Sequence, residues 1–269
     1  MNRDNRGGAH GEPTGRFRLL QLTARDLAAL SALELWGVLG LGQLQAWAYW
    51  RGGTLEERVR LFFEEIRRDD YERYGYKRLL RLERGGFVRP HICPGFKKLY
   101  LLSAGGHEEL RARARARFPE HLAEVSPYKV RHTLAVAGVW MSARAFRNVR
   151  PVAERELRYR WDMRREKPLG GIVPDLLFQG KEGMQAMEVE LSPKAHRRYL
   201  RLWQTYGRRL PRGGQVLYLT GFPGGYEMIL RLARKHQVWF IRAATINDWK
   251  LSRGFCDFNN YTLLEEDTM

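Results

Sequence analysis

The chain has 269 residues, of which 44% are hydrophobic, and its 47 lysines and arginines outnumber 30 acids, which gives a formal net charge of +17 at pH 7. Length and apolar content suffice for one large or two small domains. No apolar run reaches the roughly 18 residues that span a bilayer, and the polar N-terminus is not a secretory signal. Cys93 and Cys256 form neither a zinc pattern nor a disulfide framework. We therefore expect a cytoplasmic protein without membrane association, whose leading partner is nucleic acid.

The N-terminal part predicts a helical region that ends in a β-hairpin. Residues 1–17 are rich in Gly, Pro, Asn and Arg without periodicity, which is typical of a flexible basic arm. Thr23 can cap the first helix, with Asp26 three residues later as the second half of a capping box. Two further helices flank a charged amphipathic insertion, and two strands follow, over residues 42–47, 55–69 (the insertion), 71–84, 87–91 and 97–102. Three helices and a hairpin predict a winged-helix domain over residues 18–118.

Basic residues mark the parts of this domain that we expect to meet DNA. In the helix-turn-helix class the last helix enters the major groove, and the wing usually touches the backbone. Helical periodicity predicts Lys77, Arg78 and Arg81 on one face of the helix over 71–84. Lys97 and Lys98 lie on the predicted wing. The alternative is a solvated basic face on a winged helix that contacts proteins; the charge of the whole chain favours DNA.

A second, α/β domain is predicted over residues 126–248, after a linker at 119–125. Its expected elements are a helix over 128–146, strands over 152–159, 172–178 and 184–191, a helix over 192–206, a strand over 215–220, a helix over 226–236 and a strand over 238–242. Ser192 is a good cap for the second of these helices, and Tyr199 and Tyr206 fall on its core-facing stripe. Residues 249–269 form a polar and acidic tail.

Three acids stand out on two of these strands. The strands over 172–178 and 184–191 are joined by a Gly-containing turn and predict a hairpin. Glu188 and Glu190 share one face of the second strand, since side chains alternate with period two, and Asp175 can lie across from them. Carboxylates gathered in a half-buried sheet raise one another's pKa or need a cation between them. Hard divalent cations such as Mg²⁺ or Mn²⁺ prefer such oxygen ligands, so we expect a metal site here.

The order of these residues resembles a nuclease signature. Pro174-Asp175, then twelve residues, then Glu188-Val189-Glu190 is similar to the PD-(D/E)XK pattern, with Glu190 at the position of the usual lysine. An acid-x-acid strand after a Pro-Asp strand, preceded by a winged helix, more closely resembles the replication-relaxation family of plasmid and mobile-element proteins, over roughly residues 22–245. This resemblance implies an α/β (α+β) fold: a winged helix followed by a PD-(D/E)XK-like α-β-β-β-α-β domain with a mixed central sheet.

Three further residues are candidates for accessory roles at these acids. Lys194, just past the strand, can stand in for the missing motif lysine, or it can be a solvent-facing lysine at a helix start. Glu156 can add a ligand from the strand over 152–159, or it can form a surface ion pair with a neighbouring arginine. His132 resembles a histidine on the matching helix of replication-relaxation proteins, and it can equally be a packed or surface histidine.

Three functions remain open on the sequence alone. The first is a DNA-binding protein of a plasmid, phage or other mobile element, whose winged helix selects a site on double-stranded DNA and whose C-terminal domain nicks or cleaves it with Mg²⁺ or Mn²⁺. The second is a non-enzymatic initiator or regulator with a nuclease-like domain, which the departure at Glu190 favours. The third is a restriction-type or transposition-end nuclease. Homodimerisation and association with replication or mobilisation subunits stay open.

Overall fold

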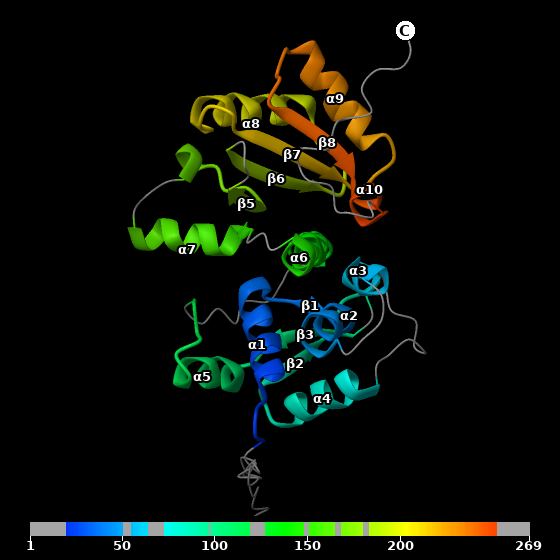
Figure 1. The fold of residues 1–269 in the computed structure, drawn as a ribbon, viewed down its shortest axis with the longest axis vertical. Helices are drawn as coiled ribbons and strands as arrows, with labels where there is room; N and C mark the ends of the chain where they lie inside the picture. Colours follow the sequence, from blue (N-terminus) through cyan, green and yellow to red (C-terminus); the bar gives the residue numbers. More distant parts are fainter. Residues whose placement is uncertain are drawn as a thin grey trace, which may run out of the picture.

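The computed structural model describes residues 20–50, 55–63, 73–96, 98–118, 127–147, 151–164, 168–179 and 183–251. It has a mixed α/β architecture, in which an N-terminal helical region with a small antiparallel sheet precedes a five-stranded mixed sheet with interleaved helices. The two parts lie one above the other, and helix α6 (Pro127–Arg147) lies between them (Figure 1). Among the helices within these ranges, none is both long and apolar enough to cross a bilayer.

The N-terminal part contains the helices and the hairpin that the sequence predicts. Its elements are α1 (Ala24–Trp36), β1 (Leu39–Gly40), α2 (Leu41–Leu44), the π-helical turn η1 (Gln45–Tyr49), α3 (Leu55–Phe63), α4 (Arg73–Arg84), β2 (Val88–His91), β3 (Leu99–Leu102) and α5 (Ala104–Ala112). The capping box of Thr23 and Asp26 is confirmed at the start of α1. Strands β2 and β3 pair antiparallel, as predicted, and β1 adds to the other edge of β3.

A buried carboxylate holds three of these elements together. Asp26 is inaccessible to solvent, and its Oδ1 accepts hydrogen bonds from Arg78 Nε (2.8 Å) and from the Tyr49 hydroxyl (3.0 Å). Its Oδ2 accepts from Arg78 Nη2 at 2.6 Å and from the Thr23 amide at 2.6 Å. Burial raises the pKa of Asp26, but the hydrogen bonds from Arg78, Thr23 and Tyr49 lower the pKa by more, so it lies below its ordinary value. The ionised carboxylate therefore joins α1, η1 and α4.

This network changes the predicted face of α4. Helical periodicity predicts Arg78 beside Lys77 and Arg81, but the guanidinium of Arg78 turns inward to Asp26 and only 9% of the residue is exposed. Lys77 and Arg81 do lie exposed on the outside. The prediction for Arg78 fails because its partner Asp26 lies 52 positions earlier in the chain, and helical periodicity considers only neighbouring residues.

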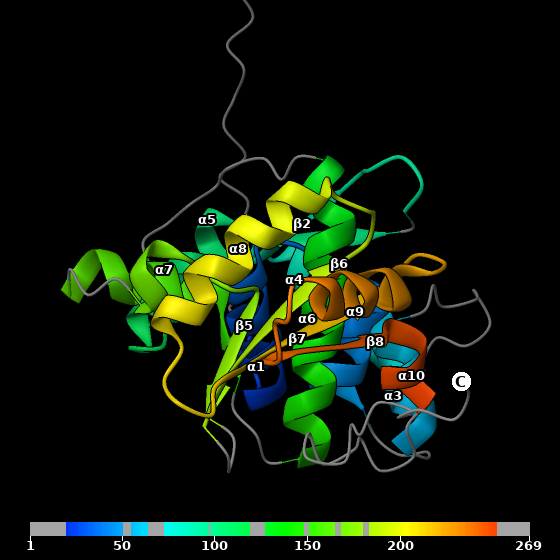
Figure 2. The ribbon, with the colours of Figure 1, turned by 90° about the horizontal axis from the view of Figure 1, so that it is seen from above.

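The C-terminal part is built on one five-stranded sheet. After α6 come β4 (Val152–Ala153), α7 (Glu154–Arg164), the 3-10 turn η3 (Pro168–Gly171), β5 (Leu176–Gln179), β6 (Met184–Glu190), α8 (His196–Arg209), β7 (Gln215–Thr220), α9 (Gly225–Lys235), β8 (Ile241–Thr245) and α10 (Ile246–Leu251). The strand order is β4-β5-β6-β7-β8: β5 pairs antiparallel with both β4 and β6, whereas β6, β7 and β8 run parallel. Helices α8 and α9 cover one face and α6 lies against the other (Figures 1 and 2).

The structure corrects one of the expected strands. The prediction of a strand over residues 152–159 is wrong, because β4 ends at Ala153 and the following residues form α7. Ion pairs at helical spacing stabilise this helix, since Glu154 lies next to Arg158 and Glu156 next to Arg160 on successive turns. The charged residues there form ion pairs one helical turn apart, although their alternation along the sequence also resembles that of a strand.

Several boundaries also differ from the prediction, among them the start of β5, which begins at Leu176 and not at residue 172. Helix α8 begins at His196 with Ala195 as its cap, not at Ser192, because the chain first passes over the end of β6, where Lys194 is held by side chains. Strand β8 occupies Ile241–Thr245, not 238–242, and α10 follows it. The expected arm at 1–17, linker at 119–125 and most of the tail at 249–269 lie outside the described residues.

One hydrophobic core runs through both parts. It includes Leu30 of α1, Trp140 of α6, Met187 of β6 and Leu219 of β7, all nearly inaccessible to solvent. The ring of Trp140 lies 5.8 Å from that of Trp36, at the end of α1. A second cluster fills the space between the opposite sheet face and α8 and α9. Helix α6 therefore serves as the common support of the helical region and the sheet.

We expect Asp26→Asn to lower the free energy of unfolding by about 3–5 kcal/mol, since it leaves the buried guanidinium of Arg78 without its partner charge. The matched change Glu109→Gln breaks an ion pair with Arg113 that is largely exposed, and it should cost less than about 1 kcal/mol. Denaturant unfolding followed by circular dichroism measures both losses. Equal, small losses would contradict the proposed anchoring role of Asp26.

Candidate functional site

The acids that the sequence singles out gather around β6. Glu188 and Glu190 lie on the face of β6 that is turned to α8, as period-two alternation predicts, while Met187 and Val189 face the core beside α6. The β5–β6 hairpin is antiparallel with Leu176 opposite Met187. Continued by one residue, this register brings Asp175 opposite Glu188. The hairpin thus brings the two acids together across neighbouring strands.

The end of β5 explains why Asp175 is held there. Continuing the register by two residues would place Pro174 opposite Val189, and proline has no N–H with which to extend the ladder. The Val189 amide donates instead to Asp175 Oδ2 at 2.7 Å, and the Val189 carbonyl lies 3.0 Å from His132 Nε2. His132 also lies 3.2 Å from Asp175 Oδ2. Asp175 and His132 therefore provide hydrogen-bond partners for the N–H and C=O of Val189, which β5 no longer reaches.

The pKa of His132 reflects these contacts. Burial of the imidazole lowers the pKa, but the hydrogen bond and the charge of Asp175 raise it by more, so it lies above its ordinary value. A protonated His132 can donate from Nε2 to Asp175 Oδ2 or to the Val189 carbonyl oxygen. Because α6 carries His132, this contact also attaches α6 to β6 at the point where β5 ends.

Glu188 is the most perturbed acid of the group. Burial raises its pKa first and the negative charge of Asp175 raises it further, to about 8, while a hydrogen bond from the Tyr206 hydroxyl (2.5 Å) and the charge of Lys194 act in the opposite direction. The carboxyl group is therefore mostly protonated at neutral pH. From the sequence, Tyr206 is expected only in the core-facing stripe of α8. Its contact with Glu188 arises because that stripe packs on the strand that carries Glu188.

Glu190 is held by a cation from its own chain. It is 2% exposed, and its carboxylate forms an ion pair with Lys194 Nζ. Burial raises the pKa of Glu190, and the hydrogen bond and charge of Lys194 oppose that shift only in part. The Lys194 amide in turn donates to the Tyr199 hydroxyl at 3.3 Å. Lys194 therefore reaches the acidic face of β6 rather than open solvent.

These contacts limit how many carboxylates remain to bind a metal ion. Within the described residues, no group of three or more His, Cys, Asp and Glu side chains has an arrangement that could hold a metal ion. The carboxylate of Glu190 is taken by Lys194, which leaves Asp175 and Glu188 as a pair whose mutual repulsion is visible in the pKa of Glu188. Mg²⁺ is commonly bound by one or two carboxylates together with waters and substrate phosphates. Asp175 and Glu188 are therefore the two carboxyl groups of the expected set that no lysine or arginine among the described residues pairs with directly.

The other candidate residues lie away from these acids. Glu156, a candidate ligand, is on α7 and forms an ion pair with Arg160. Lys98 is half-buried and paired with Glu83 at 2.8 Å, and Lys97 lies outside the described residues. Lys77 and Arg81 lie on α4, at the opposite end of the molecule from the sheet (Figure 1).

The side of α8 that faces away from the sheet carries a row of arginines. Arg197, Arg201 and Arg208 are exposed there, and none forms an ion pair with a residue within the described ranges. Their spacing of four and seven residues keeps them along one side of the helix. The helix separates these arginines from Glu188 and Glu190, because its buried stripe of Tyr199, Trp203 and Tyr206 faces the acids.

We expect Glu188→Gln to flatten the pH dependence of stability. With its pKa raised to about 8, Glu188 keeps its proton in the folded protein and loses it on unfolding, so stability falls as the pH rises from the ordinary value of 4.5 to about 8. Each pKa unit of this shift corresponds to about 1.4 kcal/mol. Melting temperatures between these pH values, with Glu156→Gln on α7 as the control, measure the effect. Parallel pH profiles for wild type and Glu188→Gln would contradict it.

Known proteins do not supply an assignment for this site. No protein-family model matches the chain, no curated protein matches it, and no solved structure matches it. A function must therefore be inferred from two places in the molecule: the acidic face of β6 beside α8, and the exposed cations of α4.

Proposed function

We propose that this chain is a cytoplasmic DNA-binding protein of a mobile element, which serves plasmid or phage replication or mobilisation. The observation that carries the proposal is the outer side of α4. Lys77, Arg81 and Arg84 are exposed there at spacings of four and three residues, and none has an ion-pair partner among the residues that the structure describes. A row of exposed cations on one helix in a chain of net charge +17 suits the phosphates and base edges of a DNA groove.

The elements around α4 support a winged-helix mode of binding. The β2–β3 hairpin follows α4 directly, and Arg89 on β2 is exposed. In this mode α4 enters the major groove and the hairpin touches the adjacent backbone. The inward ion pair of Arg78 with Asp26 fixes α4 to α1, so that Lys77 and Arg81 face outward on a rigid support.

For the C-terminal sheet we propose a PD-(D/E)XK-like role in nicking or cleaving DNA. Asp175 and Glu188 would hold Mg²⁺ or Mn²⁺, which supplies a water of lowered pKa and a charge to clamp a phosphate oxygen. Lys194, which pairs with Glu190, would supply the positive charge of the missing motif lysine. The exposed arginines of α8, on the side of the helix away from these acids, would add positive charge that attracts the phosphate backbone. His132 orients Asp175.

A second candidate is a non-enzymatic initiator or regulator whose sheet domain serves binding or assembly. Specific observations favour it. The Asp175 carboxylate already accepts the Val189 amide and contacts His132, and Lys194 neutralises Glu190. In this reading the same contacts stabilise the fold and no metal is needed. The two candidates share DNA binding through α4 and differ at Asp175 and Glu188.

The double change Lys77→Ala/Arg81→Ala should weaken binding to duplex DNA and reduce the slope of log affinity against log salt, by about 0.9 for each phosphate contact that is lost. If either side chain reads a base edge, its loss should also relax sequence preference by roughly 1–3 kcal/mol. Fluorescence anisotropy with a labelled duplex across a salt series measures both quantities.

The matched control is Arg231→Ala/Arg234→Ala, which removes the same charge from the exposed side of α9, far from α4 (Figure 1). We expect this control to retain most of the wild-type affinity. Equal losses in the two double variants would mean that net charge, and not α4, determines binding.

Nicking of supercoiled plasmid with Mn²⁺ should fall to the level seen with EDTA in both Asp175→Asn and Glu188→Gln, while duplex affinity changes little. Glu156→Gln removes an acid paired with Arg160 on α7 and should nick normally. Binding of Mn²⁺ should also stabilise the folded wild type, by about 2.7 kcal/mol at a hundredfold excess over its Kd, and not the two site variants. Neither nicking nor a metal-dependent melting shift in the wild type would favour the non-enzymatic candidate.

A further inference from the structure

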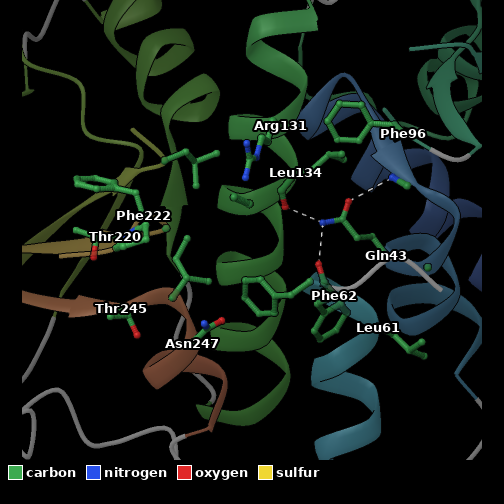
Figure 3. A pocket seen from close by; sticks show the side chains of 18 of the residues that line it. Gln43, Leu61, Phe62, Phe96, Arg131, Leu134, Thr220, Phe222, Thr245 and Asn247 are labelled. Atoms are coloured by element: carbon green, nitrogen blue, oxygen red, sulfur yellow. Dashed lines mark hydrogen bonds between the residues drawn. The ribbon is translucent and has the colours of Figure 1, made fainter. Parts of the chain in front are cut away.

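A cavity of about 690 Å³ opens between the two parts of the molecule. Figure 3 shows Arg131 and Leu134 of α6 lying between two walls. One wall carries Phe62 and Phe96 from the N-terminal part, and the other carries Phe222 and Thr245 from the C-terminal part. None of the roles proposed above uses this space.

Its size and position are those of a ligand site. Binding cavities usually measure roughly 300–1,000 Å³, have mostly apolar walls with a few polar groups, and lie where parts of a chain meet. In sheets with parallel strands, ligands bind beyond the carboxyl ends of the strands. Thr220 and Thr245 are the last residues of β7 and β8, and Leu191 directly follows β6, so all three parallel strands end at this cavity.

The side chains around the cavity favour a flat, negatively charged ligand. The rings of Phe96, Phe222 and Tyr226 line it and are only partly buried, so their faces are available for stacking. Arg131 is exposed on the α6 side and forms no ion pair with a described residue. Glu227 also lines the cavity, and a carboxylate accepts hydrogen bonds from the amino groups on a base edge.

We propose that this cavity binds an unpaired nucleotide of a DNA strand, with its base against Phe96, Phe222 or Tyr226 and its phosphate near Arg131. Base stacking on aromatic rings beside a cationic groove is the general basis of single-strand binding. The proposal rests on the function proposed above only in taking DNA as the ligand. It adds a second mode of binding, separate from α4, next to the strand that carries Glu188 and Glu190. A strand opened near the acids would be kept open there.

The test compares single and double strands in the full-length protein. A labelled single-stranded oligothymidylate, the matching duplex, and free thymidine monophosphate are titrated against wild type, Phe222→Ala and Arg131→Gln. Loss of one stacked base should weaken single-strand affinity by roughly five- to a hundredfold in Phe222→Ala. Arg131→Gln should weaken it too and lower the salt dependence, while duplex affinity stays nearly constant in both. Arg131 is exposed, so its change keeps the test valid even if Phe222→Ala fails to fold.

Matched controls locate the effect in the cavity. Trp239→Ala removes an aromatic ring that is 76% exposed outside the cavity, and Arg231→Gln removes an exposed arginine of α9 that does not line it. Both should bind the single strand like wild type. Single-strand affinity that is absent in wild type, or unchanged in both cavity variants, overturns the proposal. Free thymidine monophosphate binding as tightly as the oligonucleotide overturns it as well, because the cavity would then take a free nucleotide.

Failure of this inference and failure of the proposed function give different results. In one outcome, Lys77→Ala/Arg81→Ala loses duplex binding while Phe222→Ala and Arg131→Gln bind the single strand like wild type. This outcome rejects the cavity proposal and leaves the proposed function in place. Single-strand binding that depends on Phe222 and Arg131 in a protein that does not bind duplex DNA through α4 supports the cavity and rejects the winged-helix role.

Discussion

The backbone of Val189 sets the constraint on which the acidic site depends. Strand β6 is central in its sheet, so the N–H and C=O that Val189 turns towards β5 must find partners even where β5 has ended, because unpaired buried backbone groups are costly. Pro174 cannot supply an N–H, and the carboxylate of Asp175 and the ring of His132 take over. One proline therefore determines where the strand stops, which acid enters the ladder, and how α6 is attached.

The electrostatics of the site follow from this constraint. Burial of Glu188, together with the negative charge of Asp175 fixed in the ladder, raises the pKa of Glu188 to about 8, and the next acid on the same face is paired with Lys194. A cation entering between Asp175 and Glu188 must displace the proton of Glu188, so that metal binding and proton release would be linked. Without a cation the same residues are satisfied by protonation and by hydrogen bonds. The chain can thus hold these acids in a stable fold whether or not they act on DNA.

Local signals account for what the sequence predicted well. The capping box of Thr23 and Asp26 and the β5–β6 hairpin arise from residues close together in the chain, and both are present in the structure. Long-range partners account for what it missed. Arg78 is recruited by an acid 52 residues away, and the cavity is assembled from segments that meet only in the folded chain. The charged stretch after Ala153 is helical and is stabilised by ion pairs one turn apart, but its alternating charges are equally compatible with a strand.

The position of α6 has a consequence for how the protein can be divided. The helix contributes Trp140 and Val139 to a core that also contains residues of α1 and of β6, so a cut before α6 would expose apolar surface on both fragments. The two parts are therefore not interchangeable modules: recombination that joined the helical region to another sheet would also have to supply a new α6. A substitution that loosens this shared core lowers the folded population of the whole chain, and the α4 face and the β6 acids are lost together.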